Sequence, residues 1–183
     1  MGGAPRGRPR TGHDVVTLIA LSGSIGSGKS TLAGALVDRL PGIDLRSFGD
    51  VVRQEAAARG YGSERADLQR TGLELISEGW EQFVGKLLTP LPIARVIVVD
   101  GIRHVEAVEE LQRQLPAAEV HVVFVTASTA TVSERLADRG EDARSLEHEV
   151  EAQLPDVARR ADLVLQDEDV ATGAAGIIER FGL

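Results

Sequence analysis

The chain contains no cysteine, and this absence excludes disulfide bonds, thiolate metal sites and cysteine nucleophiles. It also lacks any apolar run that approaches the roughly 20 residues needed to cross a bilayer. No apolar stretch of the kind found in secretory signals lies near its start. We therefore expect a cytoplasmic protein with no membrane partner, in which any catalysis uses other side chains.

Positive charge is also in short supply. The 183 residues carry 20 basic and 28 acidic side chains, which gives a formal net charge of −8 at pH 7. A surface that holds nucleic acid by general attraction needs many cations, so this balance argues against one, although local clusters stay open. Lysine is rarer still, because Lys29 and Lys86 are the two that the chain contains. A lysine at a motif position therefore stands out.

The length and a hydrophobic content of 43% are enough for one substantial core, which predicts a single domain. Residues 1–13 are Gly, Pro and Arg with almost nothing apolar, so we expect a flexible tail before a domain over residues 14–183. In the tail, Arg6-Gly7-Arg8-Pro9 resembles the core of an AT-hook, a minor-groove DNA-binding element. A solvated leader is the alternative interpretation.

Short β-branched runs alternate with longer helical stretches after the tail. The runs lie at residues 15–21, 43–48, 96–99, 120–126 and 163–165. Helices are predicted over residues 30–40, 51–59, 65–88, 105–115, 129–137, 145–161 and 171–181. Near-continuous apolar strands are typical of a parallel sheet that is covered on both faces. The pattern predicts a three-layer, doubly wound α/β domain with five parallel strands and a ligand at their carboxyl ends.

One motif matches a phosphate-binding loop. The pattern G-x-x-x-x-G-K-[ST] fits residues 23–30, directly after the first strand and directly before the first helix. Glycines let the backbone N–H groups point inward at phosphate oxygens, and the helix adds its positive dipole end. The predicted ATP-binding residues are Gly23, Ser24, Ile25, Gly26, Ser27, Gly28, Lys29, Ser30 and Thr31. Lys29 would bridge the β- and γ-phosphates, Ser30 would bind Mg²⁺, and Thr31 would reach the α-phosphate.

Polar residues follow two further strands of the predicted sheet. Asp50 and Arg53 come after the second strand, and Asp100 and Arg103 come after the third. Because the carboxyl ends of parallel strands meet at one edge, we expect these side chains to converge beside the loop. Asp50 could instead only cap a helix that begins at residue 51, and Asp100 could be purely structural.

Two arginines follow the fourth strand. Arg135 and Arg139 are four residues apart, so they share one face of the helix predicted over residues 129–137 and its continuation. They could lie over the donor phosphates. The alternative is a solvated helix face on which they pair with neighbouring acidic side chains.

With these residues in place, the chain resembles the adenylate kinase-like nucleoside monophosphate kinases, including the dephospho-CoA kinases. Gly49-Asp50-Val51-Val52-Arg53 is similar to the family's acceptor-phosphate element, and Asp100-Gly101-Ile102-Arg103 is similar to its third-strand element, one residue shorter. Arg135 and Arg139 look like the lid arginines. Gln153 and Ala161-Asp162-Leu163-Val164-Leu165 are similar to the end of the dephospho-CoA kinases. The resemblance covers residues 15–181.

The resemblance implies an ATP- and Mg²⁺-dependent kinase in which Asp50, Arg53 and Arg103 bind the acceptor. Lys29, Asp50, Asp100, Arg135 and Arg139 would be catalytic, and Ser30 and Asp100 would bind the metal. Arginine suits this chemistry because its planar fork gives paired hydrogen bonds to phosphate. Residues 65–88 correspond to the family's mobile acceptor-binding flap, where Trp80 would report closure, or they form a pair of core-packing helices. Glu106 stands near the family's base-reading Gln, which argues against adenine as the acceptor base.

The sequence thus predicts a phosphotransferase that acts on a nucleotide or nucleotide-like metabolite. One alternative is a kinase for a hydroxyl group on a polynucleotide, with the Arg-rich tail as an added grip on the nucleic acid. Another is a nucleotide-binding regulator or slow ATPase that has no acceptor. The sequence does not separate ATP from GTP as the donor.

Overall fold

The computed structural model describes residues 15–138 and 153–183. Five strands form one sheet: β1 (Val16–Gly23), β2 (Asp44–Ser47), β3 (Val96–Ile102), β4 (Ala118–Thr126) and β5 (Leu163–Gln166). They lie in the order β2-β3-β1-β4-β5, and every neighbouring pair is parallel. The chain reverses its winding direction between β3 and β1, which puts the end of β1 at the switch point where α/β sheets bind ligands. The predicted fold class is confirmed.

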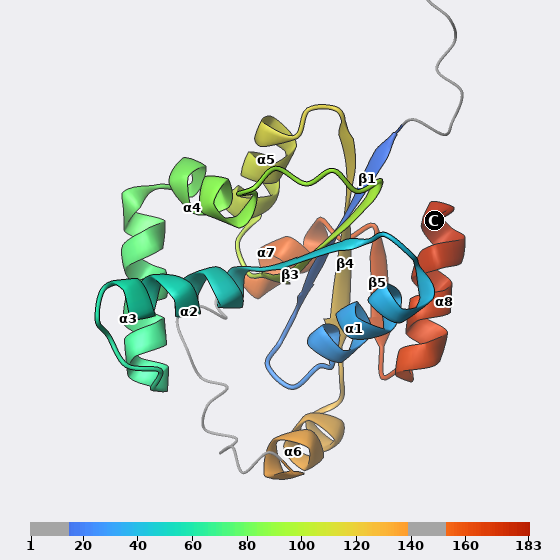
Figure 1. Ribbon diagram of the computed structural model, residues 1–183. Helices are drawn as coiled ribbons and strands as arrows, with labels where there is room; N and C mark the ends of the chain where they lie inside the picture. The colour runs from blue at the N-terminus through green and yellow to red at the C-terminus, as the bar shows by residue number, and fades with distance from the viewer. Residues whose placement is uncertain (1–14, 139–152) are drawn as a thin grey trace, which may run out of the picture.

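Two layers of helices cover the sheet (Figure 1). One layer holds α1 (Lys29–Arg39) and α8 (Val170–Phe181). The other holds α2 (Phe48–Ala58), α3 (Arg65–Glu78), α4 (Trp80–Leu87), α5 (Val105–Gln114) and α7 (Leu154–Arg159). The strand residues alternate between the two cores: Leu18 and Ala20 face one and Ile19 and Leu21 face the other, all fully buried. The remaining helix of the described residues, α6 (Thr129–Asp138), follows β4.

Three helix boundaries differ from the sequence prediction. Helix α2 begins at Phe48 rather than residue 51, because the Ser47 hydroxyl caps it by accepting a hydrogen bond from the Asp50 N–H at 3.4 Å. The stretch over residues 65–88 is two helices that break at Gly79, whose φ of 117° a right-handed helix cannot contain. Of the helix predicted over residues 145–161, the described part begins at Leu154, and residues 145–152 lie outside the described residues.

Candidate nucleotide-binding site

The phosphate-binding loop depends on glycine at its first position. Gly23 has a φ of 143°, and a side-chain carbon placed on it would lie 2.0 Å from the carbonyl oxygen of Val125 in β4. No other residue fits there, because real carbon–oxygen contacts of this kind are never so short. Gly26 and Gly28 also have positive φ angles, of 77° and 96°. The chain therefore turns sharply and enters α1 with its first N–H groups facing the loop.

Lys29 lies folded over this loop. Its ammonium group donates a hydrogen bond to the carbonyl oxygen of Ser24 at 2.9 Å, and the residue is 9% exposed. A charged side chain that is largely removed from water costs free energy unless it is paired, and the hydrogen bond to Ser24 offsets part of that cost. The head group spans the loop at the place where phosphate oxygens would meet the backbone N–H groups.

Ser30 and Asp100 meet across the sheet edge. The Ser30 hydroxyl donates a hydrogen bond to Oδ2 of Asp100 at 2.7 Å, although the residues are 70 positions apart. A β-bulge at the end of β3 creates this meeting: Leu21 pairs with Asp100 but Ser22 pairs with Ile102, and Gly101 takes up the extra residue with a φ of 91°.

A divalent cation fits the Ser30 and Asp100 pair. Oδ1 of Asp100 is buried and has no hydrogen-bond partner within residues 15–138 and 153–183. A buried carboxylate oxygen without a partner is costly, and Mg²⁺ prefers oxygen ligands of this kind, completed by water and phosphate. The two residues predicted to bind the metal are thus held together, with one carboxylate oxygen available.

Arg53 and Asp50 project from the first turns of α2. The Arg53 guanidinium donates a hydrogen bond to Oδ1 of Asp50 at 2.6 Å, and their side chains are 56% and 61% exposed. The suggestion that Asp50 caps a helix from residue 51 is wrong, because Ser47 is the cap and Asp50 lies inside the first turn. A side-chain carbon at Gly49 would lie 3.4 Å from the Arg53 guanidinium, so glycine leaves room for it.

Two cavities meet beside the loop. The phosphate cavity, about 260 Å³, is lined by Lys29, Ser30, Arg53, Asp100 and Arg103 among others. A larger cavity of about 640 Å³, which we call the acceptor cavity, lies between α2, α3, α4 and the start of α5. Both cavities share four lining residues, which are Ile25, Gly49, Arg53 and Arg103. Three of the four predicted polar residues therefore converge beside the loop, and Asp50 lies outside both linings.

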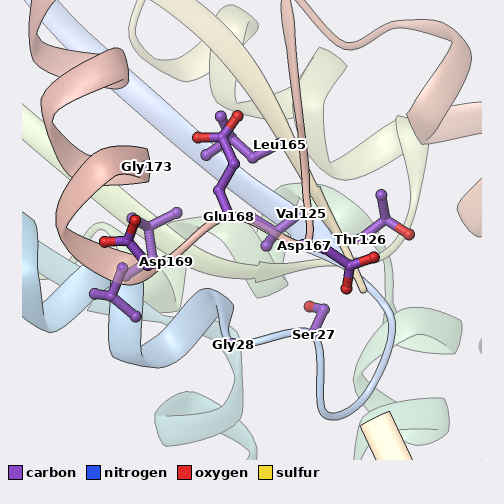
Figure 2. A pocket seen from close by; sticks show the side chains of 11 residues that line it. Ser27, Gly28, Val125, Thr126, Leu165, Asp167, Glu168, Asp169 and Gly173 are labelled. Atoms are coloured by element: carbon purple, nitrogen blue, oxygen red, sulfur yellow. The ribbon is translucent and has the colours of Figure 1, made fainter. Parts of the chain in front are cut away.

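A third pocket flanks the loop between α1 and the turn from β5 to α8 (Figure 2). Its lining includes Ser27, Gly28, Thr126, Asp167 and Asp169. Figure 2 shows the carboxylate of Asp167 above the segment that carries Ser27 and Gly28. No motif in the sequence predicted this pocket, although the Asp-Glu-Asp run at residues 167–169, directly after a strand, was a signal that could have pointed to it.

Hydrogen bonds fix two of these carboxylates. Asp167 has a positive φ of 50°, accepts a hydrogen bond from the Ser128 N–H at 2.7 Å, and so ties the loop after β5 to the loop after β4. Asp169 caps α8: a hydrogen bond from the Thr172 hydroxyl, and then bonds from the backbone N–H groups of Thr172 and Ala171, hold the pKa of its carboxyl below the usual value. Asp169 is therefore ionised at neutral pH.

Of the remaining residues that the sequence singled out, one lines the phosphate cavity and the others do not line either cavity or lie outside the described part of the chain. Thr31 lines the phosphate cavity with Ser30. Glu106, which stands near the family's base-reading Gln, is exposed between α5 and α7 and is not part of the lining of the acceptor cavity. Arg135 lies in α6, but its side chain and the whole of Arg139 lie outside the described residues.

The sheet order, the glycine loop and the pairing of Ser30 with Asp100 together define a P-loop nucleotide-binding protein with a kinase-like fold. The chain belongs to the AAA domain family, whose model matches residues 19–156, and to the UPF0200 family. It is 30% identical over 163 residues to a UPF0200 protein of Pyrobaculum aerophilum, a match that covers 84% of this chain and 89% of the relative.

Solved structures with the same fold include two proteins that match nearly the whole chain. The tunicamycin resistance protein of Deinococcus radiodurans is 20% identical, with a TM-score of 0.63, and the match covers 92% of this chain and 96% of that one. The APS kinase of Mycobacterium tuberculosis, solved with AMPPNP and APS, is 19% identical, with a TM-score of 0.58 and coverage of 92% and 99%. The predicted resemblance to P-loop kinases is confirmed in the fold. No helix in residues 15–138 and 153–183 combines the length and apolar character needed to cross a membrane.

Proposed function

We propose that this protein is an ATP- and Mg²⁺-dependent phosphotransferase that moves the γ-phosphoryl group to a nucleotide or nucleotide-like small molecule in the cytoplasm. The observation that carries the proposal is the continuity of the phosphate cavity with a larger second cavity through Arg53 and Arg103. A protein that only holds or hydrolyses a nucleotide needs no second cavity beside the γ-phosphate. The APS kinase with the same fold was solved with a nucleotide analogue and an acceptor together.

The roles of the residues follow from charge and position. Lys29 moves from the Ser24 carbonyl to the β- and γ-phosphate oxygens, where its charge offsets the negative charge that spreads over the transferred group. Ser30 and Asp100 would hold Mg²⁺, which when bound neutralises phosphate charge. Arg53 and Arg103 hold the acceptor in line, since they line both cavities. Asp50 orients Arg53.

Arg135 and Arg139 remain proposed catalytic residues on the strength of the sequence resemblance. They would add positive charge over the donor phosphates from the segment after β4. The binding residues proposed for the donor are those of the loop, from Gly23 to Thr31, and those proposed for the acceptor are Asp50, Arg53 and Arg103.

The test is an ADP-release assay with ATP and Mg²⁺ across nucleoside monophosphates, nucleosides, dephospho-CoA and short DNA. We expect at least one small-molecule acceptor to raise the rate of ADP release above basal hydrolysis. Lys29→Ala should lower that rate by about 10²-fold or more, because it removes the cation nearest the transferred group. Lys86→Ala is the matched control, since Lys86 is the other lysine and pairs with Glu55 on α2.

Three results would contradict the proposal. A rate that no acceptor raises would favour the regulator or slow ATPase. A rate raised by DNA alone would favour the polynucleotide kinase, for which the tail could act as a grip. An equal effect of Lys29→Ala and Lys86→Ala would remove Lys29 from the site.

A further inference from the structure

The acceptor cavity contains an unusual share of the aromatic side chains of this protein. The chain has one Trp, one Tyr and four Phe residues. Phe48, Trp80 and Phe83 line the acceptor cavity, together with the imidazole of His104. Half of the aromatic residues of a chain that has few of them therefore lie at one site. Aromatic rings gather in this way where a planar or apolar ligand is bound.

Trp80 is the ring of this set that a ligand can reach. Phe48 and Phe83 are 6% and 4% exposed, so they form the buried backing of the wall, and Trp80 is only partly buried. The Trp80 and Phe83 rings are nearly parallel, with centroids 5.8 Å apart and an angle of 13°. The His104 ring supports Trp80 from another side, at 5.0 Å. This packing holds the indole at a fixed angle against the cavity.

Helix α3 contributes several apolar side chains to the lining of the same cavity. Leu68, Leu73 and Ile76 line it, and Gly72 between them carries no side chain to fill the space. The nearest atom to a side-chain carbon placed on Gly72 would be Cγ2 of Val52, at 4.0 Å. A flat ring in this cavity could therefore contact both Trp80 and aliphatic side chains.

Gln69 is the neutral amide of this lining. It is partly buried, lines the acceptor cavity, and makes no side-chain hydrogen bond to any residue that the structure describes. A carboxamide presents a donor and an acceptor side by side in one plane, which matches the hydrogen-bonding edge of a nitrogen heterocycle. Arg53 and Arg103 supply positive charge at the end of the cavity that opens to the phosphate cavity. The two kinds of group lie at different parts of one site.

We propose that the acceptor is an anionic compound that carries a planar nitrogen heterocycle, and that Gln69 determines which heterocycle is accepted. The ring lies against Trp80, its edge pairs with the Gln69 amide, and its anionic group points to Arg53 and Arg103. Sugar phosphates that lack a heterocyclic base are excluded because they cannot cover the aromatic and aliphatic side chains of the cavity. This inference rests on the proposed function, since it assigns the second cavity to the acceptor.

The experiment uses the single tryptophan as its probe. The donor site is first saturated with AMPPNP and Mg²⁺, and Trp80 fluorescence is then followed while a nucleoside monophosphate or ribose 5-phosphate is added. We expect the nucleoside monophosphate to change the emission and to bind at least 10-fold more tightly than ribose 5-phosphate. Gln69→Leu should weaken binding of the nucleoside monophosphate by about 10- to 100-fold, the value of a paired amide contact to a base edge. Binding of ribose 5-phosphate should not change.

Two further variants make the test specific. Gln54→Leu on α2 is the matched control, because Gln54 is exposed and lies outside the lining of the acceptor cavity, so its affinities should equal those of the unchanged protein. Gly72→Leu should abolish binding of the nucleoside monophosphate by filling the cavity, while AMPPNP still binds.

The inference fails if ribose 5-phosphate binds as tightly as the nucleoside monophosphate, if no nucleoside monophosphate binds, or if Gln69→Leu behaves like Gln54→Leu. These failures are distinct from failure of the proposed function. Phosphoryl transfer to an acceptor without a heterocyclic base would support the proposed phosphotransferase function and overturn the inference about the acceptor. Tight, Gln69-dependent binding without acceptor-stimulated ADP release would keep the ligand class and overturn the transferase.

Discussion

A single carboxylate, that of Asp100, joins the phosphate loop to the rest of the sheet edge. One of its oxygens accepts a hydrogen bond from the Ser30 hydroxyl, and the other is buried and unpartnered among the described residues. The sequence left open whether Asp100 is structural or functional. Oδ2 makes the contact with Ser30, and we propose that Oδ1 is the oxygen that a cation would use.

Asp100→Asn tests this separation. The amide has almost the same shape, and its oxygen can still accept the Ser30 hydrogen bond, so we expect the thermal stability to change little. The affinity for Mg²⁺ should fall, because a neutral amide oxygen is a weaker ligand, and the acceptor-stimulated rate of ADP release should fall by about 10²-fold or more. Titration of the reaction rate with Mg²⁺ measures this change, and an unchanged Mg²⁺ dependence would show that Asp100 is only structural.

At the scale of elements, Arg46 connects the edge strand β2 to the chain segment that follows α4. Asp44 holds its guanidinium with two hydrogen bonds, at 2.5 and 2.8 Å, and these contacts raise the pKa of Arg46 above its ordinary value. The guanidinium then donates to the carbonyl oxygens of Leu87 and Pro90, both at 3.0 Å. Because α4 carries Trp80 and Phe83, this connection fixes the far end of the helix that forms the aromatic wall.

Arg46→Met should lower the free energy of unfolding by about 1–3 kcal/mol, since it leaves the Asp44 carboxylate and three carbonyl groups without their donor. The side chain of Arg46 is 16% exposed, so water replaces these bonds only in part. Arg113→Met is the control: Arg113 pairs with Glu110 but is 57% exposed, and its loss should cost about 0–1 kcal/mol. Urea unfolding measures both values. Equal losses would show that Arg46 contributes no more than a surface ion pair.

At the scale of the whole molecule, ion pairs between the helices that enclose the acceptor cavity make stability depend on pH. Lys86 on α4 donates to Glu55 on α2 at 2.7 Å, and Arg59, the residue that caps the end of α2, donates to Glu74 on α3 at 2.9 Å. The Lys86 hydrogen bond holds the pKa of the Glu55 carboxyl below its ordinary value, and hydrogen bonds from Arg70 and then Arg59 do the same for Glu74. These pairs connect three helices that are otherwise joined by short loops.

The sign of the pH effect follows from these lowered pKa values. In acid, the unfolded chain binds protons at these carboxyls before the folded chain does, so stability falls as the pH drops below about 4.5 and through the lower folded values. At pH values above this range, the ion pairs of Glu55 and Glu74 contribute fully to stability. Glu55→Gln should therefore lower stability at pH 7 by about 0.5–1 kcal/mol and change it less in acid. Urea unfolding at pH 7 and pH 4 measures the difference, and an equal loss at both values would contradict the assignment.

The agreement between sequence and structure is best where the signal is local. The five strands were predicted within a few residues, because short apolar runs bounded by polar residues mark most of them, although β2 (Asp44–Ser47) is itself mostly polar and has no buried residue. The loop was predicted because its glycines, Lys29 and Ser30 all lie in one continuous stretch, residues 23–30. The start of α2 was predicted three residues late, because Asp50 was given the capping role that Ser47 fills. For residues 65–88, the alternative of two helices is the correct one, because the helical stretch breaks at Gly79.

The sequence by itself determined the class of this protein, which is a parallel α/β domain with a phosphate loop after its first strand. The reason is that the signals for backbone conformation and strand burial come from residues that are neighbours in the chain. Only the tertiary structure decided the individual contacts between polar residues that lie far apart in the chain. The contacts of Ser30 with Asp100, Asp167 with Ser128, and Arg46 with the segment after α4 join residues about 40 to 70 positions apart. Such contacts leave no periodic trace in the chain, because they depend on how the helices close over the sheet rather than on the spacing of residues within one element.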